Sequence, residues 1–162
     1  MMTPLLVHPL ITALGVDGAR VVAAMAVERD FAAGEVLAEQ GTRGGALLLL
    51  LGGEVAIERE TPDGTLVPLG RAVSGAVLGV VSAVDGGPRA ARCVAAVGGR
   101  LASLAPEVVD SLLRAKSIVG LRFQLALIRA LGADLRETNR RLAVLATLPA
   151  LGVSPLGADI GE

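Results

Sequence analysis

Few side chains in this sequence have the chemistry of a catalytic group. The chain of 162 residues contains one histidine, His8, and one cysteine, Cys93. A metal site built on several imidazoles is therefore excluded, and Cys93 lies in the apolar run Cys-Val-Ala-Ala, which is typical of a core thiol. The glycines fall in turns rather than before helices, so no Walker loop or dinucleotide fingerprint is present. The sequence predicts a protein that is not an enzyme and has no metal site.

The charged residues do not favour nucleic acid as a partner of the whole chain, whose formal net charge is −1. Basic residues gather in one place. The segment from Arg114 to Arg141 holds seven of them against two acidic residues, and Arg122, Arg129 and Arg136 share one flank. Such a run is usually a solvated helix face, and an acidic partner is the alternative.

Nothing in the sequence predicts secretion or a membrane span. The first residues lack the basic region of a secretory signal. Apolar runs such as Ala46 to Leu51 are far shorter than the roughly 20 residues that a membrane helix needs. One cysteine cannot form an internal disulfide. We expect a cytoplasmic protein.

The elements that must position these side chains fall into three zones. Residues 9–25 have apolar side chains at helical spacing broken by glycines, and we expect two short helices there. From about 27 to 104, glycines and turn pairs such as Asp63-Gly64 separate short apolar runs, which indicates an antiparallel roll. The run from Ala46 to Leu51 is apolar on both faces, as in a buried strand.

The third zone is helical. Pro106 suits the first turn of a short helix, and a long helix is expected over about 117–148, ended by Pro149. The predicted fold class is therefore α+β: an antiparallel double-stranded, jelly-roll-like β-roll with short N-terminal helices and a long C-terminal helix. We expect one domain over residues 1–148 and a flexible tail over 149–162.

The long helix carries a seam at alternating steps of four and three, which is heptad spacing. A polar Asn139 within such a seam fixes register and favours a parallel two-stranded pairing. The sequence predicts a homodimer through this helix; the alternative is an amphipathic helix packed on its own roll. The seam consists of Leu121, Leu125, Ile128, Gly132, Leu135, Asn139, Leu142 and Ala146.

Three segments, in this order, resemble the cyclic nucleotide-binding domain of the catabolite-activator and protein-kinase-regulatory type. They read FAAGEVLAEQGTRGGALLLLLGGEVAIE, GGPRAA and LGADLRETNRRLAVLA. The resemblance covers roughly residues 7–148 and implies the β-roll fold. The helix-turn-helix of the transcription-factor relatives does not follow, because residues 149–162 are too few for one, so no DNA binding by this chain alone is expected.

The resemblance implies a phosphate site in residues 78–91. Arg89 falls on the family's phosphate-pairing arginine, and backbone N–H groups around Ser82 and Ala83 would add donors. Val80 stands where the family places a glutamate that accepts the ribose 2′-hydroxyl. This valine would leave the hydroxyl unpaired, at a cost of about 1–3 kcal/mol.

The resemblance also implies that Thr138 and Asn139 meet the base, as the corresponding pair does in bacterial dimers; the alternative is that they only fix the register of the seam. For Arg89 the alternative is an ion pair with Glu54 or Asp85. The ligand-binding set implied by the resemblance is Gly79, Val80, Ser82, Ala83, Arg89, Ala90, Thr138 and Asn139.

Two functions remain open at this point. The first is a stand-alone regulatory domain that acts as a dimeric protein-interaction module, with weak or lost nucleotide binding and a protein partner. The second is a working sensor of cAMP, cGMP or another phosphate ligand that signals through the long helix. Val80 favours the first, which is the predicted function; the second is the alternative, and it depends on Arg89.

Overall fold

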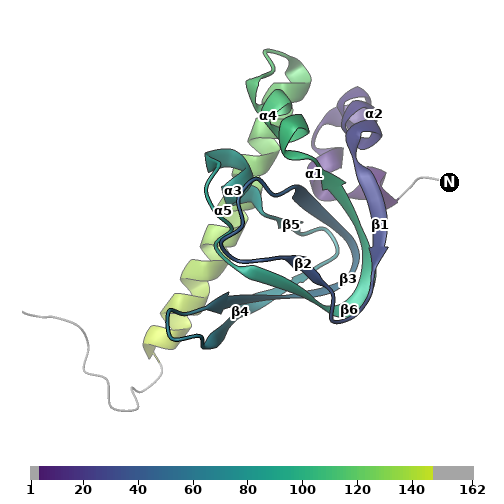
Figure 1. Cartoon of the computed structure of the whole chain (residues 1–162). Helices are drawn as coiled ribbons and strands as arrows, with labels where there is room; N and C mark the ends of the chain where they lie inside the picture. Colours follow the sequence, from purple (N-terminus) through teal and green to yellow (C-terminus); the bar gives the residue numbers. More distant parts are fainter. Residues whose placement is uncertain (1–3, 148–162) are drawn as a thin grey trace, which may run out of the picture. The chain divides into compact units, whose positions relative to one another are not determined.

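The structure is a computed structural model and describes residues 4–147 of the chain. The expected tail at 149–162 lies outside the described residues. The chain forms two compact units, and their boundary, between Leu131 and Gly132, falls within the last helix. The helices are η1 (Pro4–Val7), α1 (Pro9–Thr12), α2 (Gly15–Met25), α3 (Val80–Asp85), α4 (Pro106–Arg114) and α5 (Ile118–Thr147). The strands are β1 (Val27–Phe31), β2 (Val36–Ala38), β3 (Leu47–Glu60), β4 (Leu66–Val73), β5 (Val77–Leu78) and β6 (Arg92–Leu104) (Figure 1).

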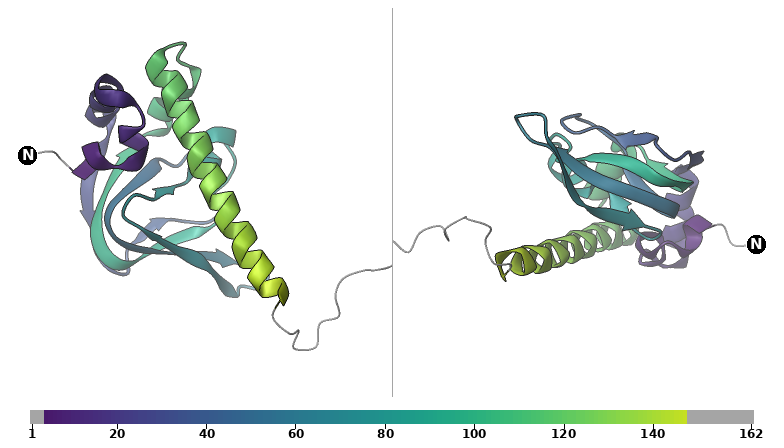
Figure 2. Two further views of the ribbon diagram at one scale, coloured as in Figure 1. Left: turned by 180° about the vertical axis from the view of Figure 1, so that it is seen from behind. Right: turned by 90° about the horizontal axis from the view of Figure 1, so that it is seen from below.

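All strand pairs are antiparallel. The sheet has the order β1-β6-β3-β4, with β2 paired to β6 and β5 paired to β3. Figure 2 shows the strands curling around a common interior. The α+β roll with short N-terminal helices and a long C-terminal helix, predicted from the sequence, is confirmed.

The curl of the sheet depends on glycine-containing segments of β3 and β6, where the register between these paired strands shifts. The register between these strands shifts around Gly52, and a Cβ on Gly99 would clash with the backbone of Gly52. Bulges and glycines of this kind let a strand bend and bring two backbones close together. The long strands β3 and β6 can therefore contribute to both ends of the roll.

The apolar run at the start of β3 is buried on both faces, as its sequence predicts. Leu47 and Leu49 belong to one hydrophobic cluster, and Leu48 and Leu50 belong to a second. Alternation of side chains across a strand explains the division. The first cluster packs against helices, and the second fills the interior of the roll.

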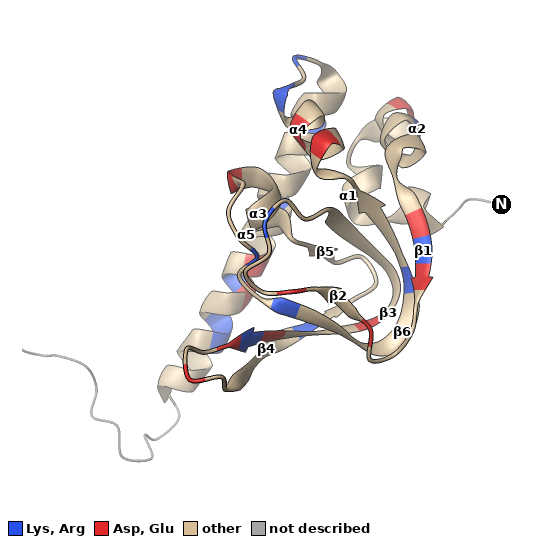
Figure 3. Cartoon of the chain, in the orientation of Figure 1, with Lys and Arg blue, Asp and Glu red and all other residues tan. Residues whose placement is uncertain are grey.

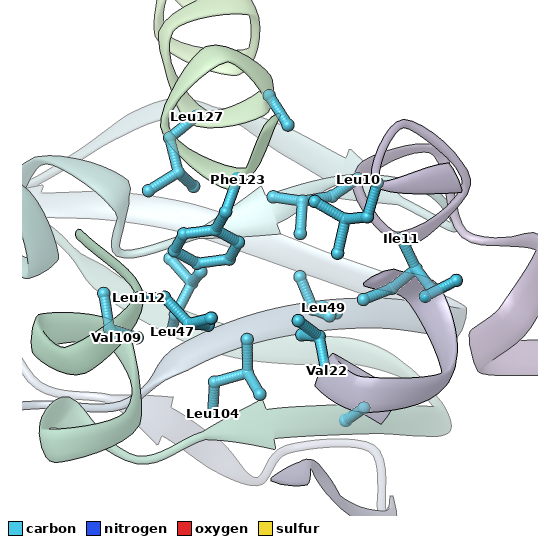
Figure 4. Packing of buried hydrophobic residues seen from close by; sticks show 14 of the residues in the cluster. Leu10, Ile11, Val22, Leu47, Leu49, Leu104, Val109, Leu112, Phe123 and Leu127 are labelled. Carbon is cyan, nitrogen blue, oxygen red and sulfur yellow. The ribbon is translucent and has the colours of Figure 1, made fainter. Parts of the chain in front are cut away.

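The helix-side cluster, shown in Figure 4, joins η1, α1, α2, α3, α4 and the first part of α5 to the sheet. Phe123 from α5 is fully buried at its centre. The chain has two phenylalanines, and the other, Phe31, lies in the interior cluster. Small aliphatic side chains fill the rest of both clusters, so single positions within them are sensitive to added volume or charge.

The turn predicted at Asp63-Gly64 closes the β3–β4 hairpin. Gly64 has a φ of 83°, and the Asp63 carboxylate accepts hydrogen bonds from Thr61 and Thr65. The outer surfaces of the sheet carry both signs of charge; Figure 3 shows acidic and basic residues next to one another on β1. Ion pairs there include Arg29–Glu35, Arg71–Glu54 and Arg100–Glu28.

Candidate functional site

Arg89 is the most deeply buried cationic side chain that the structure describes in the roll. It follows Pro88 between α3 and β6, and the residue is 7% exposed. Its guanidinium donates a hydrogen bond to the Ala46 carbonyl oxygen. No other side-chain hydrogen bond of Arg89 is found among the described residues. A guanidinium has five N–H donors, so most of its hydrogen-bonding capacity is not used by the protein.

Two glycines make room for this guanidinium. A Cβ on Gly45 would clash with Nη2 and Nε of Arg89, and a Cβ on Gly79 would clash with Nη1. Gly79 also has a φ of 84°, a left-handed conformation that favours glycine. Both positions therefore require glycine for Arg89 to lie where it does.

Arg89 lines a pocket of about 530 Å³ formed with β2, the start of β3 and the loop between these strands. That volume is in the range of small-molecule sites, which pair an apolar lining with a few polar groups. The polar side chains here are Glu39, Thr42 and Arg89. The remaining lining residues are Val36, Leu37, Ala38, Gly45, Ala46 and Leu48.

No carboxylate among the described residues forms an ion pair with Arg89. The pairing with Glu54 or Asp85 considered from the sequence is wrong: Glu54 pairs with Arg71, and Asp85 accepts a hydrogen bond from the Gly87 N–H at 2.7 Å. Burial lowers the pKa of Arg89, but a guanidinium still remains charged at neutral pH. The pocket therefore contains a desolvated positive charge.

The loop between β2 and β3 is fixed to the Arg89 segment by backbone hydrogen bonds. The Gly41 N–H donates to the Arg89 carbonyl at 2.8 Å, and the Arg89 N–H donates to the Thr42 carbonyl at 2.9 Å. The Gln40 side chain bonds the backbone of Glu60 in both directions. This loop and the arginine thus form one ordered wall of the pocket.

The short helix α3 places its side chains differently from the sequence-based interpretation. Val80 is 3% exposed and packs in the helix-side cluster, so it does not line the pocket. Ser82 is buried, and its hydroxyl donates to the Gly79 carbonyl at 3.2 Å. The Ala83 N–H also donates to that carbonyl, at 3.0 Å, and is not a spare donor. A glutamate at position 80 would need a different orientation of α3 to reach a ligand.

The segment that leads into Gly79 is held by the lone histidine. His8 is 3% exposed; its Nδ1 accepts from the Leu10 N–H at 3.2 Å, and its Nε2 lies 3.3 Å from the Ala76 carbonyl. These contacts place the ring proton on Nε2 in the neutral ring. Burial lowers the pKa of His8, which favours this neutral form. His8 is therefore structural.

The other predicted ligand residues are not among the residues that line the pocket. Ala90 is exposed next to Arg89. Thr138 and Asn139 are exposed on α5, in the unit that begins at Gly132. Their predicted contact with a base stays a prediction.

The pocket contains residues that the sequence reasoning did not select, above all Glu39, Thr42 and Gly45. The only signal for them was the Gly44-Gly45 pair, which was interpreted as a turn. Cys93 is buried in the interior cluster, and burial raises the pKa of its thiol, consistent with the predicted core thiol. Among the described residues, no group of three or more His, Cys, Asp or Glu side chains could hold a metal ion. None of the described helices is long and apolar enough to span a bilayer.

Comparisons with known proteins agree with this geometry. The sequence model of the family "Cyclic nucleotide-binding domain" matches residues 28–116. No curated protein matches the sequence, whereas many solved structures do.

Three solved structures illustrate the similarity. A cyclic nucleotide-binding domain from Methylobacillus flagellatus is 25% identical, with a TM-score of 0.77, over 90% of this chain and 84% of that one. The catabolite activator protein of Thermus thermophilus is 28% identical, with a TM-score of 0.69, over 85% of this chain and 63% of that one. The regulatory subunit of a cAMP-independent protein kinase A from Trypanosoma brucei shares the fold at 20% identity and a TM-score of 0.60, over 76% of this chain and 48% of that one.

Proposed function

The chain belongs to the cyclic nucleotide-binding domain family, and we propose that it is a regulatory domain whose pocket binds a phosphate-bearing ligand on Arg89. The ligand class is a cyclic nucleotide or a related phosphate ester. The observation that carries the proposal is the burial of Arg89 without a carboxylate partner. Of the two functions left open by the sequence, the sensor is the one this site favours.

Burial of the Arg89 guanidinium has an energetic cost. A charged group removed from water destabilises the fold by several kcal/mol unless other groups compensate it. Arginines on the outside of the sheet, such as Arg71 and Arg100, have carboxylate partners. The Arg89 guanidinium has one hydrogen-bond acceptor among the described residues, the Ala46 carbonyl oxygen. A bound phosphate would supply the missing negative charge through charge-assisted hydrogen bonds.

A route from the pocket to the helices supports a regulatory role. Gly79, against the Arg89 guanidinium, is followed directly by Val80, which packs in one cluster with Val109 of α4 and Phe123 of α5. A ligand that shifts Gly79 therefore changes the packing of α4 and of the first part of α5. We propose that the signal leaves the domain through α5.

We further propose that a second copy of this chain covers the seam of α5. Leu121, Leu125 and Ile128 are 65%, 43% and 63% exposed, so these three seam residues do not pack on their own roll. The face of α5 that packs on the roll carries Phe123 and Leu127 instead. Exposed apolar residues at heptad spacing favour a partner helix with the same spacing.

The ligand proposal is tested by titrating the protein with cAMP, cGMP and inorganic phosphate, using calorimetry and thermal unfolding. We expect saturable binding of at least one cyclic nucleotide, and a loss of affinity of about 10- to 100-fold in Arg89→Met, since charged hydrogen bonds contribute about 1.5–3 kcal/mol. Arg71→Met, which removes an exposed arginine, is the matched control and should bind like the wild type.

The unliganded Arg89→Met variant should unfold at the same temperature as the wild type or higher, because a desolvated charge is removed. That result would show that lost binding is not caused by lost folding. A wild-type protein that binds none of the ligands at millimolar concentration would contradict the sensor and leave the interaction module as the function.

Dimerisation is tested by size-exclusion chromatography with light scattering. We expect a dimeric wild type, a monomeric Leu135→Asp variant, and no change in Val97→Asp, where the valine is exposed on β6 away from the seam. A monomeric wild type would end the dimer proposal.

A further inference from the structure

Three polar side chains line the pocket, and two of them, Glu39 and Thr42, are absent from the ligand set implied by the family resemblance. Arg89 is the cation. Thr42 donates its hydroxyl proton to the Glu39 carbonyl at 2.8 Å, so towards a ligand it acts mainly as an acceptor. Glu39 contributes a carboxylate, which is a pure acceptor when ionised.

Helix α3 contributes no side chain to the pocket lining. The side chain of Val80 is apolar and buried in the helix-side cluster, and Ser82 is buried with its hydroxyl donating to the Gly79 carbonyl. A hydroxyl group on a ligand held at Arg89 therefore has its side-chain acceptors in the loop between β2 and β3, where Glu39 and Thr42 line the pocket. Glu39 is the one carboxylate in the pocket lining.

Neighbouring groups orient the Glu39 carboxylate and leave some of its lone pairs free to accept a hydrogen bond from a ligand. Its Oε2 lies 3.4 Å from Nε of Arg92, and its side chain is 55% exposed. Arg92 also lies 3.8 Å from Glu58, on β3. The backbone bonds of Gly41 and Thr42 to Arg89 fix the loop relative to the cation. The carboxylate and the guanidinium are thus parts of one preorganised pocket.

We propose that Glu39 selects the ligand, accepting the ribose 2′-hydroxyl of a cyclic nucleotide whose phosphate lies on Arg89 and disfavouring phosphates of higher charge. This inference rests on the proposed function. The 2′-hydroxyl is the only free hydroxyl on the ribose of a 3′,5′-cyclic nucleotide, and its phosphate carries one negative charge. The dianionic phosphate of 5′-AMP is repelled more strongly by a neighbouring carboxylate.

The test compares three probes, cAMP, 2′-deoxy-cAMP and 5′-AMP, on the full chain by calorimetric titration. In the wild type we expect cAMP to bind about threefold to tenfold more tightly than 2′-deoxy-cAMP, the range for one hydrogen bond near the surface. Glu39→Ala should abolish the preference for cAMP over 2′-deoxy-cAMP. It should also reduce the ratio of the affinities for cAMP and 5′-AMP, because the carboxylate that repels the dianionic phosphate is removed. Glu39→Gln should narrow the 5′-AMP preference while keeping an acceptor for the hydroxyl.

Glu58→Gln is the matched control, because Glu58 contacts the same arginine but does not line the pocket. It should leave both preferences unchanged. A wild type that binds cAMP with a 2′-hydroxyl preference that Glu39→Ala leaves intact would overturn this inference alone. A wild type that binds none of the probes would overturn the proposed function as well.

Discussion

His8 and Arg89 are both buried basic side chains with no carboxylate partner within residues 4–147, and burial affects their charge differently. His8 uses both ring nitrogens in hydrogen bonds to Leu10 and Ala76, and burial lowers its pKa so that the neutral ring is favoured. Arg89 cannot give up its charge at neutral pH and has one carbonyl acceptor. A buried group that can become neutral is satisfied by hydrogen bonds within the chain. One that must stay charged indicates a partner from outside the chain.

The surroundings of the two side chains also differ, because one side chain lies in a packed region and the other lines a pocket. His8 caps α1 and joins it to the segment before β5. Arg89 lies against Gly45 and Gly79 and lines a pocket. The His8 region is packed for stability, and the Arg89 region leaves space at the cost of an incompletely compensated charge. This is the pattern expected where stability and ligand binding compete.

The largest expected effect on stability comes from placing a charge in the hydrophobic core without a hydrogen-bonding or ionic partner. Val80→Glu restores the family's residue, but it places a carboxylate in the helix-side cluster. We expect the free energy of unfolding to fall by about 3–5 kcal/mol, measured by urea titration. Val81→Glu is the control, since Val81 is 54% exposed and should change stability by less than about 0.5 kcal/mol. An equally stable Val80→Glu variant would show that α3 reorients readily.

A smaller effect distinguishes two roles of neighbouring glycines: Gly45 leaves space for the guanidinium, and Gly44 allows the conformation of the loop. In Gly45→Ala the new methyl displaces the flexible end of Arg89, so we expect nearly unchanged stability and about tenfold weaker binding of cAMP. Gly44→Ala is the reverse case: its φ of 67° strains an alanine by about 1 kcal/mol, with no atom within 4 Å of the new Cβ. It should lose stability and keep its affinity. Equal affinities in the two variants would contradict the role of Gly45.

The smallest effect is the pH dependence of stability from His8. Because its folded pKa is lowered, the unfolded state takes up the proton first as pH falls below about 6.5. Stability contributed by the neutral ring is therefore present above that pH, declines as pH falls, and levels off below the folded pKa. His8→Asn keeps a side-chain acceptor for the helix cap and should show a flatter profile between pH 7 and 5 in urea titrations. Since His8 is the only histidine, identical profiles would contradict this role.

Much of the architecture follows from local sequence pattern. The run at Leu47–Leu50, the turn at Asp63-Gly64 and the glycines between short apolar segments were sufficient to predict the roll. Proline at 106 and helical spacing after it were sufficient to predict α4 and α5. These features depend on neighbouring residues and on the alternation of apolar side chains, so they are visible without tertiary structure.

The sequence by itself determined the fold and the family resemblance and marked Arg89 as a candidate ligand residue, because these depend on periodicity and on short ordered motifs. Only the tertiary structure decided what surrounds that arginine. Gly45, Ala46 and Glu39 lie more than 40 residues away in sequence, and Val80 faces the core because of how α3 packs on α4 and α5. Whether a charge is compensated depends on every group that folding brings within a few ångströms of it, and sequence spacing does not contain that information.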